Sequence, residues 1–336
     1  HDSHRRQRQM CIRDRGVDNM DNIEQFLEQH GKVMLVNEQR REKVANKITK
    51  QFKELAQYLN KVFTVWFNEY RDENNTVDIT TAQKALTVSE RATILQHLKR
   101  YERPNFYNGL SREQQLDYTN SYNKIIQKAT ENKLSYLESM IEIEILAFYT
   151  ALNIKVDDTL TNEIEREYDY TRQIVNAENL ETPVETIKEK VAPDKDKSLL
   201  NQRTVLLATI LLLVKTALIA NKPRLQTTKQ MTKQVAKASA QFTSTLRSTI
   251  ADSQIEAQRQ SYHDCDIKRY CFVSETEMYK HTSLGGKSTA KGKNLTPCPI
   301  CQGLNGQIFH VKNMKRGKNA PTMHPNCRCS TVPVIG

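Results

Sequence analysis

Apolar residues recur at intervals of three and four along most of this chain, which is the spacing of one face of an α-helix. The first such stripe begins at Val44 and ends near Arg71. Its members are Ile48, Phe52, Leu55, Leu59, Val62, Trp66 and Tyr70. The stripe predicts a long amphipathic helix, and Trp66 and the tyrosines on such stripes are expected in the core rather than as ligand platforms.

Shorter patterns predict further helices up to about residue 180. Thr87 and Glu90 have the spacing of a capping box, in which each side chain accepts a hydrogen bond from the other residue's backbone N–H. A helix is expected after them. Another apolar stripe is formed by Leu134, Leu137, Ile141, Ile145 and Phe148. A separate helix is expected from Leu160 to Asn176, so residues 20–180 are predicted to be a helical bundle domain.

The next segment, residues 181–198, contains Pro183, Pro193 and alternating charges, which predict a linker or a bundle turn. It is followed by Thr204–Ala220, an apolar segment interrupted by Lys215. This segment is shorter than the roughly 20 residues that a membrane-spanning helix needs. We therefore expect a helix buried on all sides and no stable membrane insertion, and the alternative is a segment embedded in a membrane or in a partner protein.

After Pro223, residues 225–262 predict one more helix with two distinct faces. Its inward positions are Val235, Phe242, Leu246, Ile250 and Ile255. Lys229, Lys233 and Lys237 lie four residues apart on the outward side, where they form a basic stripe.

Glycine and proline are concentrated in the last 52 residues, which hold seven of the ten glycines and five of the nine prolines. This change predicts that a helical body ends in a less regular module. The predicted fold is mainly α: an elongated helical bundle followed by a small Cys/His-rich module that is α+β or irregular. The helices of residues 199–262 and the module of residues 263–332 are expected to form one domain, 199–336.

The start of the chain differs in character from the rest. It opens with HDSHRRQRQMCIRDR, which looks like a translated adapter, so residues 1–19 are expected to be a non-native or disordered tail. Met20 is the expected start of the native sequence, which would make Cys11 irrelevant. The first apolar run, Val33–Val36, is too short for a signal peptide.

The charge is strongly asymmetric within a chain whose net charge is +11. Residues 197–336 carry 21 basic and 6 acidic side chains, a net charge of +15, whereas residues 1–196 carry 29 and 33. Such a positive field favours a polyanionic partner, and solvated helix faces are the alternative.

The seven cysteines are sparse and odd in number, which argues against a secreted disulfide framework. Cys298 and Cys301 form a CxxC pair, and after 22 intervening residues come His324, Cys327 and Cys329 in the sequence HPNCRC. Two thiolates two residues apart can take adjacent corners of a tetrahedron, as in a zinc knuckle on a turn relaxed by glycine. A structural zinc site is predicted, with three candidates for its two remaining corners; disulfides, a redox-variable cluster and free thiols remain alternatives.

Catalytic signals are weak. The segment from residue 278 onward has no carboxylate to orient His324 or to hold Mg²⁺, and no catalytic residue is assigned. Gly285–Thr289 (GGKST) lacks the first glycine of a phosphate-binding loop because residue 281 is histidine, so a flexible basic loop is expected. Cys265 and Cys271 are a weak second pair. His263, His281 and His310 have no spaced partners and are expected to be ordinary polar residues.

The sequence CPICQGLNG followed by HPNCRC, with the helix Arg247–Gln260 before it, resembles the phage head-morphogenesis family, the minor head proteins typified by that of phage Mu. The resemblance covers about residues 240–332, and the preceding helical part looks like the N-terminal half of minor capsid proteins of phages of Gram-positive bacteria. This chain has Asn294–Pro297 where family members often carry an acidic residue and an arginine, so a contact made by those residues is not expected here.

The resemblance implies a non-enzymatic virion component that binds the phage portal inside the procapsid and acts in head assembly, in contact with capsid or scaffold proteins. It implies a location in the capsid interior, and in the host cytoplasm during assembly. Lysine and arginine can neutralise DNA phosphates without reading the base sequence, so non-specific DNA binding is possible. A zinc-containing enzyme that acts on nucleic acid, such as a nuclease, is the alternative.

Overall fold

The computed structural model describes residues 17–175, 177, 181–280 and 298–335, with side chains described from residue 26 onward. Most of the predicted tail, the basic loop Gly285–Thr289, His281 and Asn294–Pro297 lie outside the described residues. Residues 17–19 of the predicted tail belong to the first helix.

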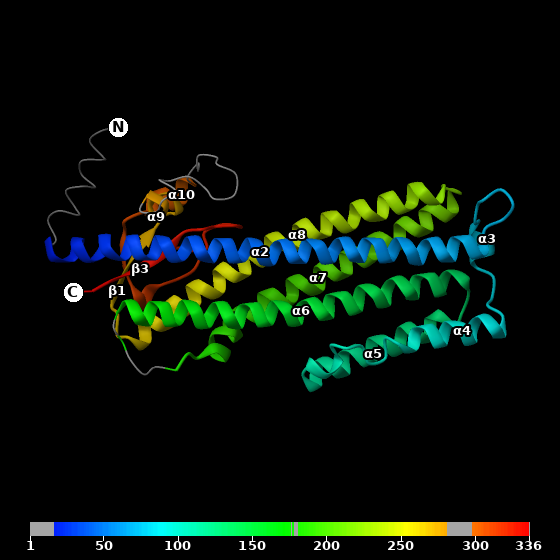
Figure 1. Ribbon diagram of the computed structural model, residues 1–336, viewed down its shortest axis with the longest axis horizontal. Coiled ribbons are helices and arrows are strands. Elements are labelled where there is room, and N and C mark those ends of the chain that lie inside the picture. Colours follow the sequence, from blue (N-terminus) through cyan, green and yellow to red (C-terminus); the bar gives the residue numbers. More distant parts are fainter. Residues whose placement is uncertain (1–16, 176, 178–180, 281–297, 336) are drawn as a thin grey trace. The chain divides into compact units, whose positions relative to one another are not determined.

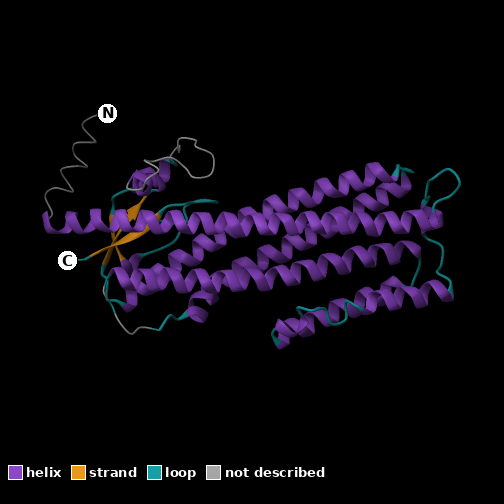
Figure 2. Cartoon of the chain, viewed as in Figure 1, coloured by secondary structure: helices purple, strands orange, loops and turns teal. Residues whose placement is uncertain are grey.

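Helices account for most of the described chain (Figures 1 and 2). The α-helices of the described residues are α2 (Val17–Tyr70), α3 (Ile79–Ala82), α4 (Val88–Lys99), α5 (Arg112–Ala129), α6 (Lys133–Ile174), α7 (Val184–Ile219), α8 (Arg224–Asp264), α9 (Glu275–Lys280) and α10 (Pro299–Leu304). Three strands, β1 (Arg269–Val273), β2 (Ile308–His310) and β3 (Ser330–Val334), form an antiparallel sheet in the order β2-β1-β3. The fold is mainly α with a small Cys/His-rich α+β module at its C-terminal end, as the sequence predicts.

The predicted capping box is present at the start of α4. The backbone N–H of Thr87 donates to Glu90 Oε2 at 2.6 Å, and the N–H of Glu90 donates to Thr87 Oγ1 at 3.2 Å. The two hydrogen bonds satisfy backbone groups that a helix start leaves unpaired. Ser111 and Gln114 make the same arrangement at the start of α5.

The expectation of two helices between Leu134 and Asn176 is wrong, because α6 is continuous from Lys133 to Ile174. The buried stripe continues through the predicted break, with Leu152, Val156 and Leu160 all at most 3% exposed. Since these residues keep the spacing of four, nothing in the packing interrupts the helix.

The predicted linker 181–198 is also wrong, because most of it forms the first part of α7. Pro193 lies inside this helix. The buried positions continue across the proline at intervals of four: Ile187, Val191, Lys195 and Leu199. Proline removes one helical hydrogen bond, but the packing on both sides of it retains the helix.

The apolar segment Thr204–Ala220 is buried on one side only, not on all sides as expected. Ile210 and Val214 are fully buried, whereas Leu212 and Ile219 are each 67% exposed. By length and composition, α7 is apolar enough to cross a membrane, and a third of its most apolar window is buried within the protein.

The chain divides into two compact units that are assembled from separated stretches of sequence. The first contains the described parts of His1–Ala45, Thr159–Pro193 and Ser244–Gly336, and the second contains Asn46–Asp158 and Asp194–Thr243. Four long helices each contribute residues to both units, and Pro193 stands at one of the boundaries.

In the first unit, the sheet packs against helices through the alternating side chains of β1. Cys271 and Val273 lie in a cluster with Met34 of α2, whereas Tyr270 packs with Tyr262 of α8. Successive side chains of a strand point to opposite faces, so the sheet contacts α2 and α8 through different faces. Phe272, on the same face as Tyr270, packs against the cysteines described below.

In the second unit, α4 and α5 pack against α6 around a core of leucine, isoleucine and tyrosine. Leu98 is fully buried in this core. Tyr118 donates a hydrogen bond to the carbonyl of Tyr101 at 2.9 Å.

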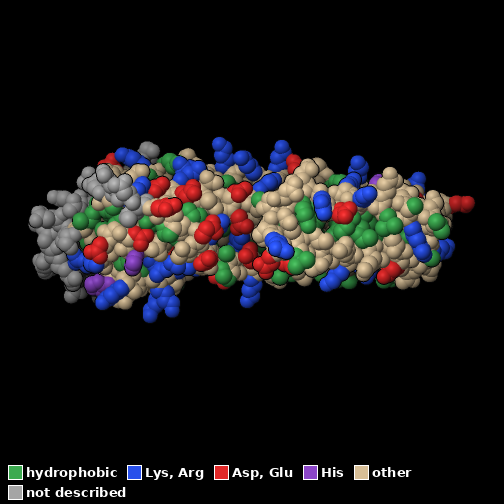
Figure 3. Space-filling view, turned by 90° about the horizontal axis from the view of Figure 1, so that it is seen from below, with side chains coloured by type: hydrophobic (Ala, Val, Ile, Leu, Met, Phe, Trp, Pro, Cys, Tyr) green, Lys and Arg blue, Asp and Glu red, His purple; other side chains and the backbone are tan. Residues whose placement is uncertain are grey.

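On the face seen in Figure 3, basic and acidic side chains are interspersed, with hydrophobic side chains between them.

Candidate metal centre

The CxxC pair opens a helix rather than a turn. Cys298 is the N-cap residue of α10, Pro299 follows it at the first helical position, and Cys301 lies in the first turn. Proline is favoured at this position because its missing N–H has no partner within the helix. Gly306 has a φ of +77° and turns the chain toward β2, a conformation that glycine adopts without strain.

The HPNCRC loop lies directly before β3 and is held against α8. Asn326 has a φ of +58°, which asparagine tolerates better than most residues. Its backbone N–H donates to the hydroxyl of Ser248 at 3.2 Å, and its side-chain amide donates to the hydroxyl of Ser244 at 3.2 Å. These contacts fix the bend between His324 and Cys327.

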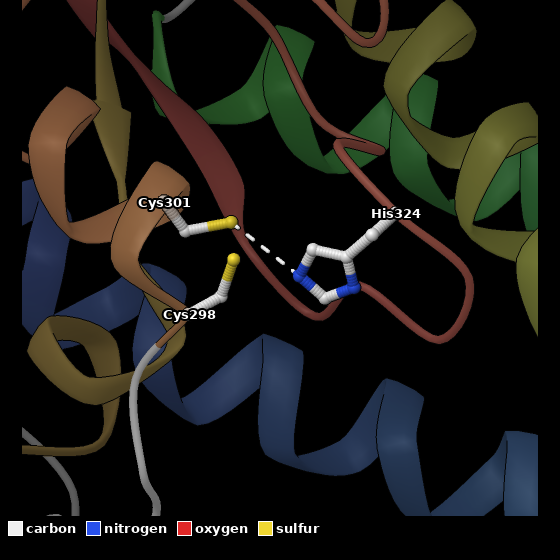
Figure 4. Close-up of side chains that lie close together, drawn as sticks. All are labelled: Cys298, Cys301 and His324. Atoms are coloured by element: carbon white, nitrogen blue, oxygen red, sulfur yellow. Dashed lines mark hydrogen bonds between the residues drawn. The ribbon is translucent and has the colours of Figure 1, made fainter.

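The predicted ligands come together in one cluster. Cys298, Cys301 and His324 point toward one another, and their ligand atoms lie within 4.8 Å of each other (Figure 4). Cys301, Cys327 and Cys329 satisfy the same limit, so Cys301 belongs to both groups. These residues can hold a metal ion.

The distance from Cys301 to His324 matches tetrahedral coordination, and the distance from Cys301 to Cys327 is slightly longer. The Sγ of Cys301 lies 3.6 Å from His324 Nε2 and 4.0 Å from Cys327 Sγ. Bond lengths of about 2.3 Å to sulfur and about 2.0 Å to nitrogen place tetrahedral ligands about 3.5 to 3.8 Å apart.

His324 is oriented as a metal-binding histidine. Its Nδ1 lies 3.0 Å from the carbonyl oxygen of Pro325, to which an N–H at that position donates. The proton is then held on Nδ1, and the lone pair of Nε2 faces the cysteines. A backbone carbonyl in this role is a common second partner of a ligating imidazole.

The thiols have contrasting environments. Burial raises the pKa of Cys301, whereas backbone N–H groups at the start of α10 hold the pKa of Cys298 below its usual value. A hydrogen bond from Cys329 lowers the pKa of Cys327, and the same contact raises the pKa of Cys329. Metal binding would displace the remaining thiol protons.

An apolar layer surrounds the cluster. Phe272 of β1 is fully buried against the cysteines, and Leu304, Phe309 and Met323 pack at its edge. This layer limits the access of water, and it shows that the module has an apolar core of its own.

The residues that attach the cluster to α2 were not predicted from the sequence. Arg328, between two of the cysteines, lies 2.6 Å from Glu38 and 3.2 Å from Glu275. The hydroxyl of Tyr279 also donates to Glu38. The predicted apolar stripe begins at Val44, so it does not include Glu38. The one sequence feature that points to this contact is Arg328 within HPNCRC.

Asp252 of α8 was missed as well. It accepts a hydrogen bond from Thr322 and lies 3.0 Å from Arg316. The carboxylates that are absent from the segment after residue 278 are therefore supplied by other elements, and in the described contacts they bind arginines rather than His324.

The other cysteines and histidines that the sequence singled out, where the structure describes them, lie outside the cluster. Cys271 packs on the α2 side of the sheet, and Cys265 lies at the end of α8 next to Ser261. His263 is exposed beside Asp264. No disulfide joins the cysteines of the described chain.

Comparisons with known proteins add no relative. No family model matches the chain, and neither a curated protein nor a solved structure matches it.

Proposed function

We propose that Cys298, Cys301, His324, Cys327 and Cys329 supply the ligands of a structural zinc ion. Thiolate and imidazole donors at tetrahedral spacing suit Zn²⁺, whereas Mg²⁺ and Ca²⁺ prefer oxygen ligands. A structural zinc site takes four protein ligands, so these five candidate donors can fill every corner without a water ligand, and three of them compete for two corners. The Cys301–Cys327 separation of 4.0 Å is also a coordination distance rather than a disulfide bond.

We propose further that the protein is a phage minor head protein that acts in head morphogenesis. The observation that carries this proposal is the assembly of CPIC and HPNCRC, the motifs of the resemblance, into one cluster braced by long helices. The expected partners are the portal and the capsid or scaffold proteins. On this proposal the protein is not an enzyme, it does not insert stably into membranes, and it lies inside the capsid after assembly in the host cytoplasm.

Proximity to packaged DNA is supported by the basic stripe of α8. Lys229, Lys233 and Lys237 are all exposed, and Met231 and Val235 between them are buried. Within the described part of the chain none of these lysines has an ion-pair partner. Their charges are therefore available to neutralise phosphates of any sequence.

The test is a gel-shift series with the full chain and long duplex DNA, over a range of salt concentrations, with and without Zn²⁺ and Mg²⁺. Replacing the three stripe lysines with glutamine should lower the slope of log affinity against log salt by about 2 to 3, because each phosphate contact contributes about 0.9. The matched control replaces Lys47, Lys50 and Lys53, which are exposed on α2, and should change the slope less.

Two outcomes would contradict the proposal. An unchanged slope of log affinity against log salt in the triple lysine variant would show that these lysines do not contact DNA. Metal-dependent cutting of the DNA would favour the nuclease alternative, and the loss of cutting on substitution of His324 would locate the activity at the metal centre.

A further inference from the structure

The second unit contains a cavity between α2, α4 and α6 that the proposed function does not use. Its volume is about 180 Å³. Its floor is apolar and is formed by Val62, Trp66, Leu137 and Met140. Trp66 is only 2% exposed, and its indole N–H donates to the carbonyl of Lys133 at 2.8 Å, so this floor is fixed in place.

The rim of the cavity is polar and mainly basic. Lys61, His97 and Arg100 are exposed residues of its lining. Among the described residues that line the cavity, Glu69 is the one carboxylate. Two permanent cations and a histidine against one carboxylate make the mouth attractive to negative charge.

Arg100 is held in position by neighbouring side chains. It donates hydrogen bonds to the hydroxyls of Tyr58 and Tyr101 and lies over the Tyr101 ring at 4.7 Å. Glu144 lies 3.6 Å away, but burial raises its pKa to about 7. Burial therefore disfavours the ionised form of the carboxyl that lies nearest to Arg100.

The volume of the cavity indicates which kind of ligand it can hold. Sites for whole small molecules and cofactors usually measure about 300–1,000 Å³, well above the 180 Å³ found here. A cavity of this size instead suits one apolar side chain that protrudes from a partner, which is how anchor residues bind at protein interfaces.

We propose that this cavity is a docking site for a polypeptide partner, which inserts one large apolar side chain onto the Trp66 floor and places acidic residues against Lys61 and Arg100. The inference goes beyond the proposed function and does not rest on it. A stacked nucleic-acid base would be the other occupant for a site with aromatic and basic groups. It fits less well, because the floor beside Trp66 is aliphatic, formed by Val62, Leu137 and Met140.

The chain provides its own reporter, since Trp66 is its single tryptophan. The experiment follows the fluorescence of the full chain during titration with a capped pentapeptide that has phenylalanine between two pairs of glutamates. Two matched peptides replace the phenylalanine with serine or the glutamates with lysines. An oligothymidylate is the fourth probe.

Occupation of the cavity predicts a saturable change in Trp66 emission with the glutamate–phenylalanine peptide and weaker binding of both matched peptides. Lys61→Glu should weaken the first peptide by about fivefold or more, the size of one charge contact of about 1 kcal/mol. Lys53→Glu, an exposed lysine on the same helix outside the cavity, should leave the affinity unchanged. Both variants change exposed positions, so folding should be preserved.

The proposal is overturned if the first peptide gives no saturable change, if the serine peptide binds equally well, or if Lys53→Glu and Lys61→Glu have the same effect. Preference for the lysine peptide would also overturn it. An oligothymidylate that produces the emission change and competes with the peptide would assign the cavity to nucleic acid instead.

Discussion

The guanidinium of Arg328 lies 2.6 Å from the carboxylate of Glu38, so the side chain between two candidate metal ligands reaches a buried acidic group on α2. Glu275 at the start of α9 shares the same arginine at 3.2 Å. The first unit is therefore held together at this point by one cation between two carboxylates, each from a different element. The metal cluster and the first helix are expected to be coupled in stability.

Arg328→Ala should lower the free energy of unfolding by about 2–3 kcal/mol. Loss of one partner of a buried ion pair costs about 3–5 kcal/mol, and a smaller value is expected because a quarter of the Arg328 side chain is exposed. Chemical denaturation of the full chain measures the effect. Lys268→Ala is the control, because Lys268 and Asp266 are both more than 70% exposed, and it should change stability by less than about 0.5 kcal/mol. Equal effects of the two substitutions would contradict the structural role of Arg328.

The two sides of α7 should respond differently to truncation. Ile210 is fully buried, and Ile210→Ala should cost about 2–4 kcal/mol through lost packing and a cavity. Leu212 is 67% exposed, and Leu212→Ala should stay within about 0.5 kcal/mol. Thermal or chemical unfolding distinguishes them. A large loss of unfolding free energy for Leu212→Ala in the isolated protein would mean that the side of α7 that carries Leu212 is also buried.

Helix positions were predictable where a single local pattern decides the outcome. The stripe from Ile48 to Tyr70 and the Thr87–Glu90 capping box depend on neighbours within one or two turns, and the structure confirms both. The prediction of a linker at residues 181–198 failed because proline disfavours a helix when only its neighbours in sequence are considered. The helix is retained by the burial of Val191 and Lys195, which depends on residues distant in sequence.

His30 should make the first unit sensitive to acid. Burial lowers the pKa of His30 to about 4 from about 6.5, so the unfolded chain binds a proton more readily between these values. Stability from this group is complete above about pH 6.5 and is lost as the pH falls toward 4. Burial also raises the pKa of Glu167 to about 7, which acts in the opposite direction between about pH 4.5 and 7.

A comparison with His30→Gln isolates the histidine, because glutamine can keep the contact to the hydroxyl of Ser330 and does not titrate. The stability difference between the native protein and this variant should change by about 3 kcal/mol in favour of the variant as the pH falls from 6.5 to 4. His263→Gln, at an exposed position, should show no such change. A constant difference across this range would show that His30 does not sense pH.

The residues of the candidate cluster could be predicted from the sequence, but the residues that hold the cluster in place could not. CxxC and HPNCRC specify donors through their own spacing, and the structure brings all five residues together. Glu38 and Asp252 lie on helices far away in sequence, and their roles depend on tertiary packing. No local pattern distinguishes them from surface carboxylates.

The most direct test of the central claim is the metal content of the full chain purified under reducing conditions, measured for the native protein, Cys301→Ser and Cys265→Ser. Cys301 belongs to both ligand groups, whereas Cys265 belongs to neither. A structural zinc site predicts about one zinc ion per chain in the native protein and in Cys265→Ser, and loss of the metal with lower stability in Cys301→Ser. A folded native protein without metal, or a Cys301→Ser variant that keeps its zinc, would contradict it.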